Sequence, residues 1–465
     1  MNKLDSNLVA NSFLQAGFSF TDAPADADVV LVNTCSVRNH AEERVLSLLG
    51  HMKHIKKTRP ELVVAVFGCM AQRCEDDLLK HEVVNIVCGP LQIPELVNLV
   101  NNAIDHTKKQ KSVSENIRHK PLPQDLGSLD DFEQNYDSAE NNLPAQAFVR
   151  VMHGCDKFCS YCVVPYVRGP EVSRPPEKII EQIKKLADTG VKQITLLGQT
   201  VNSYLYNNFS FADLLYDVSK INGIEWIKFV TCYPKNFGEK IFRAMADLPK
   251  VCRYLHIPAQ SGSDRILKAM NRHYTAAEYM AILDRARQIV PDIAIAGDFI
   301  VGFCGETNED FQKSAELVQK AQYKNSFIFK YSPRPGTRAD EKLIDDVPME
   351  IKKQRNIALL AVQEKVSEEL NKSFIGKTVK VLVEGTSKKS HLDNACVIAS
   401  EAKQSQSFEG LRLPRPFRPR NDSYQLIGRT AGDYIVVFKG SAGLAGQFAD
   451  VKISRASALT LFGEL

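Results

Sequence analysis

The feature that most constrains the fold is a regular alternation of short apolar runs, rich in β-branched residues, with stretches of helical periodicity. It extends from the first residues to about residue 365. In residues 1–105 the predicted strands lie at 29–32, 62–67 and 83–87, and the predicted helices at 41–49 and 71–80. Strands that alternate with helices pair in parallel and bury both faces of their sheet. This region therefore predicts an N-terminal parallel α/β sheet domain.

A second alternating region covers residues 146–370. Six apolar runs there predict strands, at 147–152, 193–197, 226–230, 254–257, 293–301 and 326–331. The helix expected between the first two has apolar residues at 179, 180, 183, 186 and 187, after Pro175-Pro176 and before Gly190. Six such units predict an open or partial (β/α) barrel, with its chemistry at the carboxyl ends of the strands.

Two other segments depart from this pattern. Residues 106–145 are polar, with little periodicity, and predict a linker or surface excursion. Residues 371–465 contain period-two alternation punctuated by glycine and predict a small antiparallel β-barrel. An insertion at about 390–424, with four arginines between Arg412 and Arg420, interrupts this barrel and predicts a poorly ordered loop. It is either an RNA-contacting loop or a neutral insertion, and we favour the second.

Charge and hydropathy restrict the cellular setting. The chain has 59 basic and 55 acidic residues, a balance too even to indicate nucleic-acid binding by itself. It contains no run of 18 apolar residues and no secretory signal, so we expect a cytoplasmic protein that does not enter a membrane. In such a compartment the 11 cysteines are not expected to form disulfides, and clustered cysteines indicate metal binding or catalysis.

Three of these cysteines form the strongest chemical signal. Cys155, Cys159 and Cys162 have the spacing C-x3-C-x2-C and directly follow a predicted strand. Thiolates are soft ligands that suit an iron–sulfur cluster or zinc. No fourth Cys or His lies at a suitable spacing for a structural zinc site, so a cluster with one open iron is favoured over a zinc-binding module. Phe158 and Tyr161 are placed to shield such a cluster from water.

The same cysteines, with the residues around them, resemble the radical S-adenosylmethionine (SAM) methylthiotransferase family. The matching motifs are VVPYVRGPEVSRP at 163–175, LLGQTVN at 196–202, HIPAQSGS at 256–263, DFIVGFCGET at 298–307, YSPRPGT at 331–337, NTCSVR at 33–38 and GCMAQ at 68–72. In residues 371–465, IGRT at 427–430 and FGE at 462–464 resemble the RNA-binding TRAM domain of that family. The resemblance covers nearly the whole chain except 106–145 and 390–424, and it implies a central radical SAM partial (β/α)6 barrel.

The resemblance also implies an activity. Members of this branch add a methylthio group to carbon 2 of N6-isopentenyladenosine at position 37 of tRNA, and the LLGQ and VVPYVRG motifs favour this substrate. Alternatives are a methylthiotransferase that acts on threonylcarbamoyladenosine in tRNA or on a ribosomal protein, and a tRNA-binding protein that has lost sulfur insertion. We expect a monomer. The sequence assigns neither the electron donor nor the sulfur source.

The family implies two 4Fe-4S clusters. The first, on Cys155, Cys159 and Cys162, binds SAM through its open iron, and one-electron cleavage of SAM yields a 5′-deoxyadenosyl radical. The second delivers sulfur, and Cys35 and Cys69 match two of its ligands. The third matches a position two residues before Met1, so we interpret the chain as N-terminally truncated and expect a weak second cluster. Cys74 and Cys88 either replace this ligand or are ordinary packed thiols, and the latter is favoured.

The remaining candidate residues concern SAM and RNA. For SAM we expect contacts from Gly198, Gln199, Gln260 and Gly302, although the glycines would serve tight turns equally well. Arg168 and Arg174 are candidates for the SAM carboxylate or a tRNA phosphate, with a solvated surface role as the alternative. In the closing barrel, Lys377, Lys380, Arg429 and Lys439 are candidate phosphate contacts. Cys232 and Cys304 are expected to be packed thiols.

Overall fold

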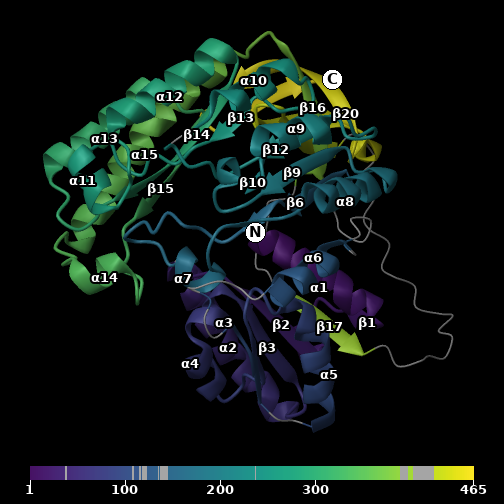
Figure 1. Ribbon diagram of the computed structural model, residues 1–465. Coiled ribbons are helices and arrows are strands. Elements are labelled where there is room, and N and C mark those ends of the chain that lie inside the picture. The colour runs from purple at the N-terminus through teal and green to yellow at the C-terminus, as the bar shows by residue number, and fades with distance from the viewer. Residues whose placement is uncertain are drawn as a thin grey trace.

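The computed structural model describes residues 1–36, 39–106, 109–114, 117, 123–134, 136, 145–235, 237–387, 396–401 and 424–465. The N-terminal lobe lies below the larger central lobe in Figure 1, and the C-terminal strands lie at the upper right of the central lobe. Helix α1 (Asn2–Gln15) lies at the boundary between the two lobes. Leu4 and Leu8 of α1 join the core of the central lobe, whereas Val9 and Phe13 join that of the N-terminal lobe. One helix therefore ties both cores together.

The N-terminal lobe contains the expected parallel sheet. Its parallel strands are β2 (Val29–Thr34), β3 (Val63–Gly68), β4 (Ile86–Cys88) and β5 (Gln110–Ser112). Separate apolar clusters lie on its two faces, and the helices α2 (Asn39–Thr58) and α5 (Leu96–His106) belong to this lobe. Thr34 pairs with Gly68 in register, so the residues after β2 and β3 leave the sheet side by side.

The insertion at 390–424 was wrongly predicted to be entirely a loop. Its residues Cys396–Glu401 form strand β17, which pairs antiparallel with both β1 (Phe18–Phe20) and β2. Figure 1 shows β17 in the N-terminal lobe, far along the chain from its neighbours. The backbone groups of β2 on this side need partners, and the run Val397-Ile398-Ala399 has the β propensity to supply them. The arginines at 412–420 lie outside the described residues.

The segment 106–145 was also wrongly predicted to be a linker. It contains β5, which extends the sheet, and helix α6 (Pro123–Gln134), which packs on α8 (Pro176–Asp188). Leu129 of α6 is buried with Leu91 and Ile117. A few apolar side chains suffice to dock this polar segment because their partners come from other elements, which local composition does not reveal.

The central lobe confirms the partial barrel of six parallel strands. They are β6 (Gln146–Arg150), β9 (Gln193–Leu197), β12 (Trp226–Phe229), β13 (Tyr254–His256), β14 (Ala294–Val301) and β15 (Asn325–Lys330). They form two three-stranded halves, β6-β9-β12 and β13-β14-β15, joined by a parallel bridge between Ile227 and Val251. The covering helices are α8, α9 (Phe211–Ser219), α10 (Glu239–Asp247), α12 (Ala276–Ile289), α13 (Asn308–Ala321) and α15 (Met349–Lys372).

The C-terminal residues close the expected small barrel. Its strands are β16 (Thr378–Thr386), β18 (Tyr424–Thr430), β19 (Ile435–Gly440), β20 (Phe448–Ala456) and β21 (Thr460–Glu464). The pairings are antiparallel except that of β19 with β21, which is parallel. This one parallel pair departs from the antiparallel barrel that period-two alternation predicts.

A half-buried carboxylate of the small barrel contacts two buried lysines of the central lobe. Asp433, in the turn between β18 and β19, lies 3.2 Å from the Nζ atom of Lys228 and 3.3 Å from that of Lys324. Burial lowers the pKa of Lys324 to about 8. Burial also disfavours the Asp433 carboxylate, but Lys324 and Lys228 hold its pKa below the usual value. Both lysines are more than nine-tenths buried, and Asp433 is the carboxylate that they share.

We predict that Asp433→Ala weakens this docking by about 3–5 kcal/mol, because it leaves two buried ammonium groups without their carboxylate. Thermal unfolding and limited proteolysis near residue 433 would measure the loss. Asp433 has a φ of 63°, which Asn tolerates better than Ala, so Asp433→Asn is the matched control for backbone strain. Equal stability of the Ala variant and the parent chain would contradict the prediction.

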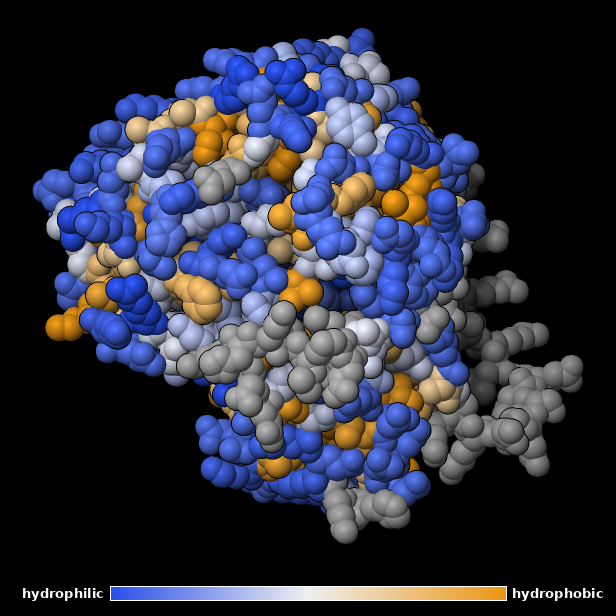
Figure 2. All heavy atoms as spheres, viewed as in Figure 1, coloured by the Kyte–Doolittle hydropathy of each residue, from blue (hydrophilic) through white to orange (hydrophobic). Residues whose placement is uncertain are grey.

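The outer surface is predominantly polar on the face shown in Figure 2, with small, separate apolar patches. Within the described ranges, no helix combines the length and apolarity needed to cross a membrane.

Candidate functional site

The three clustered cysteines lie on one loop at the barrel rim. The loop begins after β7 (Met152–His153) and continues into helix α7 (Val164–Arg168). The Cys155 amide donates to the Gly169 carbonyl at 2.9 Å, so the end of α7 closes back on the start of the loop. Gly154 makes this possible: its φ is 69°, and a Cβ there would lie 1.8 Å from the Pro170 carbonyl oxygen. Only glycine fits this closure.

A distant turn holds the middle of the loop in place. The Ser160 amide donates to the Met270 carbonyl at 3.0 Å, and the Ser160 hydroxyl donates to the Ala269 carbonyl at 2.8 Å. The Asn271 side chain donates to the Phe158 carbonyl at 2.8 Å. The cysteine loop is therefore ordered by the residues between α11 (Asp264–Ala269) and α12.

The same turn supplies a cation to one of the thiols. The Nη1 atom of Arg272 lies 3.1 Å from the Cys159 sulfur, and its guanidinium group lies over the rings of Tyr233 and Tyr274 at 4.5 and 5.1 Å. A buried guanidinium that donates to sulfur stabilises a thiolate. Arg272 was not predicted from the sequence, because it is 113 residues from Cys159 and no local motif indicates it.

The three thiols suit an iron–sulfur cluster better than a single metal ion. Burial, and then the neighbouring Cys159, raise the pKa of Cys162 to about 12, and burial also raises that of Cys155. In the described part of the chain, no three Cys, His, Asp or Glu side chains converge on one point that a lone ion would occupy. A cluster binds each thiolate to a different iron, so its ligands are spaced around it. Cys155, Cys159 and Cys162 fit such a set, with one iron left for another ligand.

Aromatic side chains line one side of this loop. Tyr161 packs against Phe303 with ring centroids 6.4 Å apart, and Phe303 packs against Tyr331 at 4.8 Å. Cys304 is buried in the same apolar group and is a packed thiol, as is the buried Cys232. Phe158 is instead 46% exposed, so of the two aromatic residues expected to shield a cluster, Tyr161 is the one that lies in an apolar wall.

The four residues expected to contact SAM separate into two kinds. The amide oxygens of Gln199 and Gln260 are buried and have no hydrogen-bond partner among the described residues. Gln260 also has a φ of 70°, an unusual conformation for this residue type. These unsatisfied groups fit contacts with a polar ligand. For Gly198 and Gly302, close packing explains the glycine: a Cβ would lie 2.5 Å from the Met152 side chain and 2.3 Å from the Lys352 side chain, respectively.

A histidine–aspartate pair lies at neighbouring strands of the barrel. The Nε2 atom of His256 on β13 lies 3.0 Å from a carboxylate oxygen of Asp298 on β14, and the Thr231 amide donates to Nδ1 of His256 at 3.3 Å. Because Nδ1 accepts, Nε2 carries the proton and donates to Asp298. The sequence analysis included both residues in its motifs but gave neither a role.

The two N-terminal cysteines come together as their strands predict. Cys35 follows β2 and Cys69 follows β3. The pKa of Cys69 is raised, mainly by burial and in part by the nearby Cys35. Arg168 of the central lobe donates to the Cys69 sulfur at 3.2 Å, and Arg334 of the same lobe interacts electrostatically with Cys35. Two thiols beside two guanidinium groups fit an anionic cluster.

Cys74 and Cys88 do not join this pair. Cys88 is fully buried in an apolar cluster on one face of the sheet, and its thiol donates weakly to the Gly89 carbonyl at 3.6 Å. Burial raises its pKa, as expected of a packed thiol. Cys74 caps α3 (Cys69–Arg73) at the edge of the other apolar cluster. Both therefore behave as packing residues.

Arg168 and Arg174, the candidates for anionic ligands, are occupied by carboxylates of the protein itself. Arg168 lies 2.7 Å from Asp5, and Arg174 lies 3.0 Å from Glu133. Both side chains are at least 95% buried. We therefore do not include them in the SAM site. The sequence contains no local signal for these pairs, because Asp5 and Glu133 are distant in the chain.

The candidate phosphate contacts of the small barrel differ in their ion pairs and in their exposure. Lys380 pairs with Glu225 of the central lobe at 3.0 Å, and Arg429 pairs with Glu384 at 3.2 Å. Lys377 and Lys439 are exposed. Lys380 is exposed as well, so the three lysines are better placed for RNA than the half-buried Arg429.

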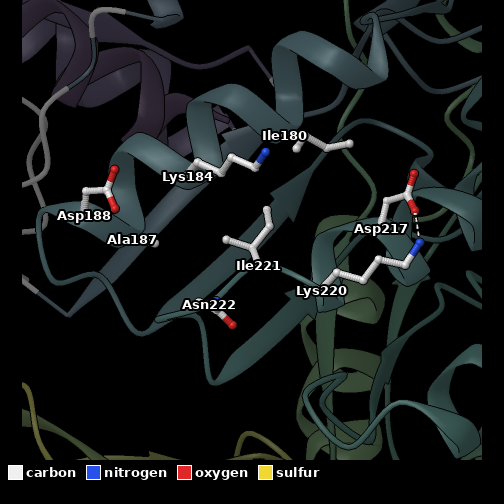
Figure 3. Close-up of a pocket in the computed structure, with 8 residues that line it drawn as sticks. All are labelled: Ile180, Lys184, Ala187, Asp188, Asp217, Lys220, Ile221 and Asn222. Atoms are coloured by element: carbon white, nitrogen blue, oxygen red, sulfur yellow. Dashed lines mark hydrogen bonds and ion pairs between the residues drawn. The ribbon is translucent and has the colours of Figure 1, made fainter.

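A pocket of about 500 Å³ lies away from all of these groups, on the outer side of the barrel. Figure 3 shows it between α8 and the end of α9, where Lys220 pairs with Asp217. Its lining residues are Ile180, Lys184, Ala187, Asp188, Asp217, Lys220, Ile221 and Asn222. It contains none of the thiols or unsatisfied amides described above, so we do not assign the chemistry to it.

Comparison with known proteins agrees with this division into three parts. Residues 1–89 match the uncharacterized protein family UPF0004, residues 149–318 the radical SAM superfamily, and residues 417–465 the TRAM domain. The whole chain aligns with a tRNA-2-methylthio-N(6)-dimethylallyladenosine synthase of Rhodopirellula baltica, at 43% identity over 93% of that protein. Similarly named proteins of Acidovorax sp. and Thermotoga petrophila are 40% and 38% identical, over 95% and 94% of their lengths and all of this chain.

Proposed function

The chain belongs to the family of tRNA-2-methylthio-N(6)-dimethylallyladenosine synthases, and from this premise we propose that it adds a methylthio group to carbon 2 of N6-dimethylallyladenosine at position 37 of tRNA. The observation that supports this most directly is the ordered loop of Cys155, Cys159 and Cys162 at the barrel rim, with Arg272 donating to Cys159. This loop provides the sulfur ligands that radical SAM chemistry needs.

The residues of this chain have distinct roles in the proposal. Cys155, Cys159 and Cys162 would hold the 4Fe-4S cluster that binds SAM, and Cys35 and Cys69 would supply two ligands of the second cluster, whose third ligand matches no residue of this chain. When bound, the first cluster and SAM supply a 5′-deoxyadenosyl radical, and the second cluster supplies sulfur. Gln199 and Gln260 would orient SAM through their unsatisfied amide oxygens. The wall that contains Tyr161, Phe303 and Tyr331 would exclude water from the radical.

The substrate and setting complete the proposal. The tRNA would contact the C-terminal barrel, where Lys377 and Lys439 are exposed for phosphate binding. The small, separate apolar patches on the face shown in Figure 2 support a monomer, which we propose acts in the cytoplasm. The electron donor remains unassigned.

Analysis of tRNA nucleosides tests this function. We expect that the chain, expressed in a bacterial host that lacks its own enzyme, produces methylthio-dimethylallyladenosine detectable by mass spectrometry. The control is the same chain with Cys155, Cys159 and Cys162 replaced by Ala, which should leave dimethylallyladenosine unmodified. Methylthiolation of threonylcarbamoyladenosine instead would reassign the substrate. Retained tRNA binding without any methylthio product would indicate a binding protein that does not insert sulfur.

A further inference from the structure

We propose that Arg168 is a positioning residue for the N-terminal cluster, which it holds and makes easier to reduce through a hydrogen bond to the Cys69 sulfur. This inference rests on the proposed function, since it requires a cluster on Cys69. Arg168 belongs to the central lobe, whereas the cluster that it would position lies in the N-terminal lobe.

The contact arises from the way α7 and α3 pack. Helix α7 begins two residues after Cys162 and lies against α3, whose first residue is Cys69. Cys69 is buried with Val163 and Val167, on opposite sides of the lobe boundary. Arg168, the last residue of α7, then places its Nε atom 3.2 Å from the Cys69 sulfur. The segment that follows the cysteine loop therefore contacts Cys69, a proposed ligand of the second cluster.

A buried ion network fixes the orientation of the Arg168 side chain. Its Nη2 atom lies 2.7 Å from Asp5 of α1, and Asp5 also pairs with Arg150. Arg150 lies 3.2 Å from Glu133, which lies 3.0 Å from Arg174. Because a guanidinium is planar, the bond from Nη2 to Asp5 directs Nε in one direction, which is toward Cys69.

The charges of the network are balanced without a cluster. Three arginines, Arg150, Arg168 and Arg174, are matched by Asp5, Glu133 and Asp130. Arg334 of the central lobe interacts electrostatically with Cys35, but it also interacts with Glu42 and Glu43. An iron-bound thiolate carries negative charge, and reduction of the cluster adds more. Within this balanced network, Arg168 donates directly to the Cys69 sulfur, and this hydrogen bond favours the reduced cluster.

The hydrogen bond has a chemical consequence that a simple ion pair would not have. A donor on a ligating sulfur withdraws electron density from iron, and hydrogen bonds to sulfur are among the protein features that set cluster potentials. Loss of the Arg168 donor should therefore lower the reduction potential of this cluster. Loss of other network members should shift the potential less, because they act on the cluster through charge alone.

The experiment isolates the second cluster and then removes the donor. In full-length chain with Cys155, Cys159 and Cys162 replaced by Ala, anaerobic reconstitution loads only the N-terminal site. Redox titration followed by electron paramagnetic resonance then compares three versions: this parent, Asp5→Asn, and Asp5→Asn with Arg168→Gln. The Asp5→Asn variant removes the carboxylate but keeps the Arg168 donor to Cys69. The double variant removes both, so that no carboxylate is left without its partner.

We expect the double variant to be about tenfold harder to reduce than Asp5→Asn, which corresponds to a midpoint potential lower by about 59 mV for one electron. Asp5→Asn should differ much less from the parent. Equal midpoint potentials for Asp5→Asn and the double variant would overturn the proposal. Should the double variant fail to fold, Asp5→Asn with Arg168→Met, which has no N–H donor, is titrated instead. An unchanged potential there would overturn it equally.

The outcomes separate this inference from the proposed function. A parent chain that binds no iron at the N-terminal site would overturn the role of Arg168, whatever the nucleoside assay shows. A clear shift in potential, together with no methylthio product from the unmodified chain, would support Arg168 and count against the proposed substrate.

Discussion

Replacement of Cys159 by serine is expected to abolish methylthiolation of tRNA and to remove the iron of one cluster per chain. Serine is a hard, weakly ionised ligand and does not replace a thiolate on iron. The change also leaves the buried Arg272 without its sulfur partner. Iron analysis after anaerobic reconstitution, formation of 5′-deoxyadenosine from SAM, and nucleoside mass spectrometry would measure the three losses.

The matched control for this change is Cys252→Ala. Cys252 is equally buried, but it packs with Trp226 and Leu382 between the central lobe and the small barrel. We expect its replacement to leave the iron content and the product unchanged, with a stability loss of about 1 kcal/mol for the removed sulfur atom. Full cluster content in Cys159→Ser would show that the cysteine loop does not ligate iron as we infer.

Replacement of Glu133 by alanine is expected to destabilise the protein by about 3–5 kcal/mol, the cost of breaking a buried ion pair from one side. Glu133 is fully buried, and its two oxygens lie 3.2 Å from Arg150 and 3.0 Å from Arg174. Burial raises the pKa of Glu133 against the influence of both arginines. Its loss would leave two guanidinium groups without their shared partner. Urea unfolding monitored by circular dichroism would measure the change.

Glu133→Gln is the control that separates charge from shape. The amide keeps an oxygen that accepts from an arginine and keeps the packed volume, so we expect no more than about half the loss of the alanine variant. Two variants as stable as the parent would contradict a structural role for this network. Such a result would also support the original prediction that residues 106–145 form a linker.

The sequence was most informative where chemistry and spacing are local. The cysteine loop could be predicted because three ligands within eight residues must approach one another in any fold. The six barrel strands could be predicted because buried parallel strands are short, apolar and β-branched. The expectation that Cys35 and Cys69 meet followed from the rule that carboxyl ends of parallel strands share one edge.

The predictions that failed depend on partners distant in the chain. Residues 106–145 are too polar to indicate a docked helix. Glu133 of this segment is nevertheless buried, because it forms ion pairs with Arg150 and Arg174. Strand β17 was missed because its partners, β1 and β2, lie more than 350 residues earlier in the chain. Arg168 and Arg174 were assigned to external anions because their internal carboxylates are invisible to spacing arguments.

The sequence by itself determined where the clustered cysteines lie and the order of the three folding units, because residue spacing and strand periodicity are properties of neighbouring residues. Only the tertiary structure decided what surrounds those ligands. Arg272 reaches Cys159 across 113 residues and Arg168 reaches Cys69 across 99. Such contacts depend on how helices pack and turns close, and a hydrogen bond requires a donor within a few tenths of an ångström of its place. Local sequence does not encode that position; the packed core does.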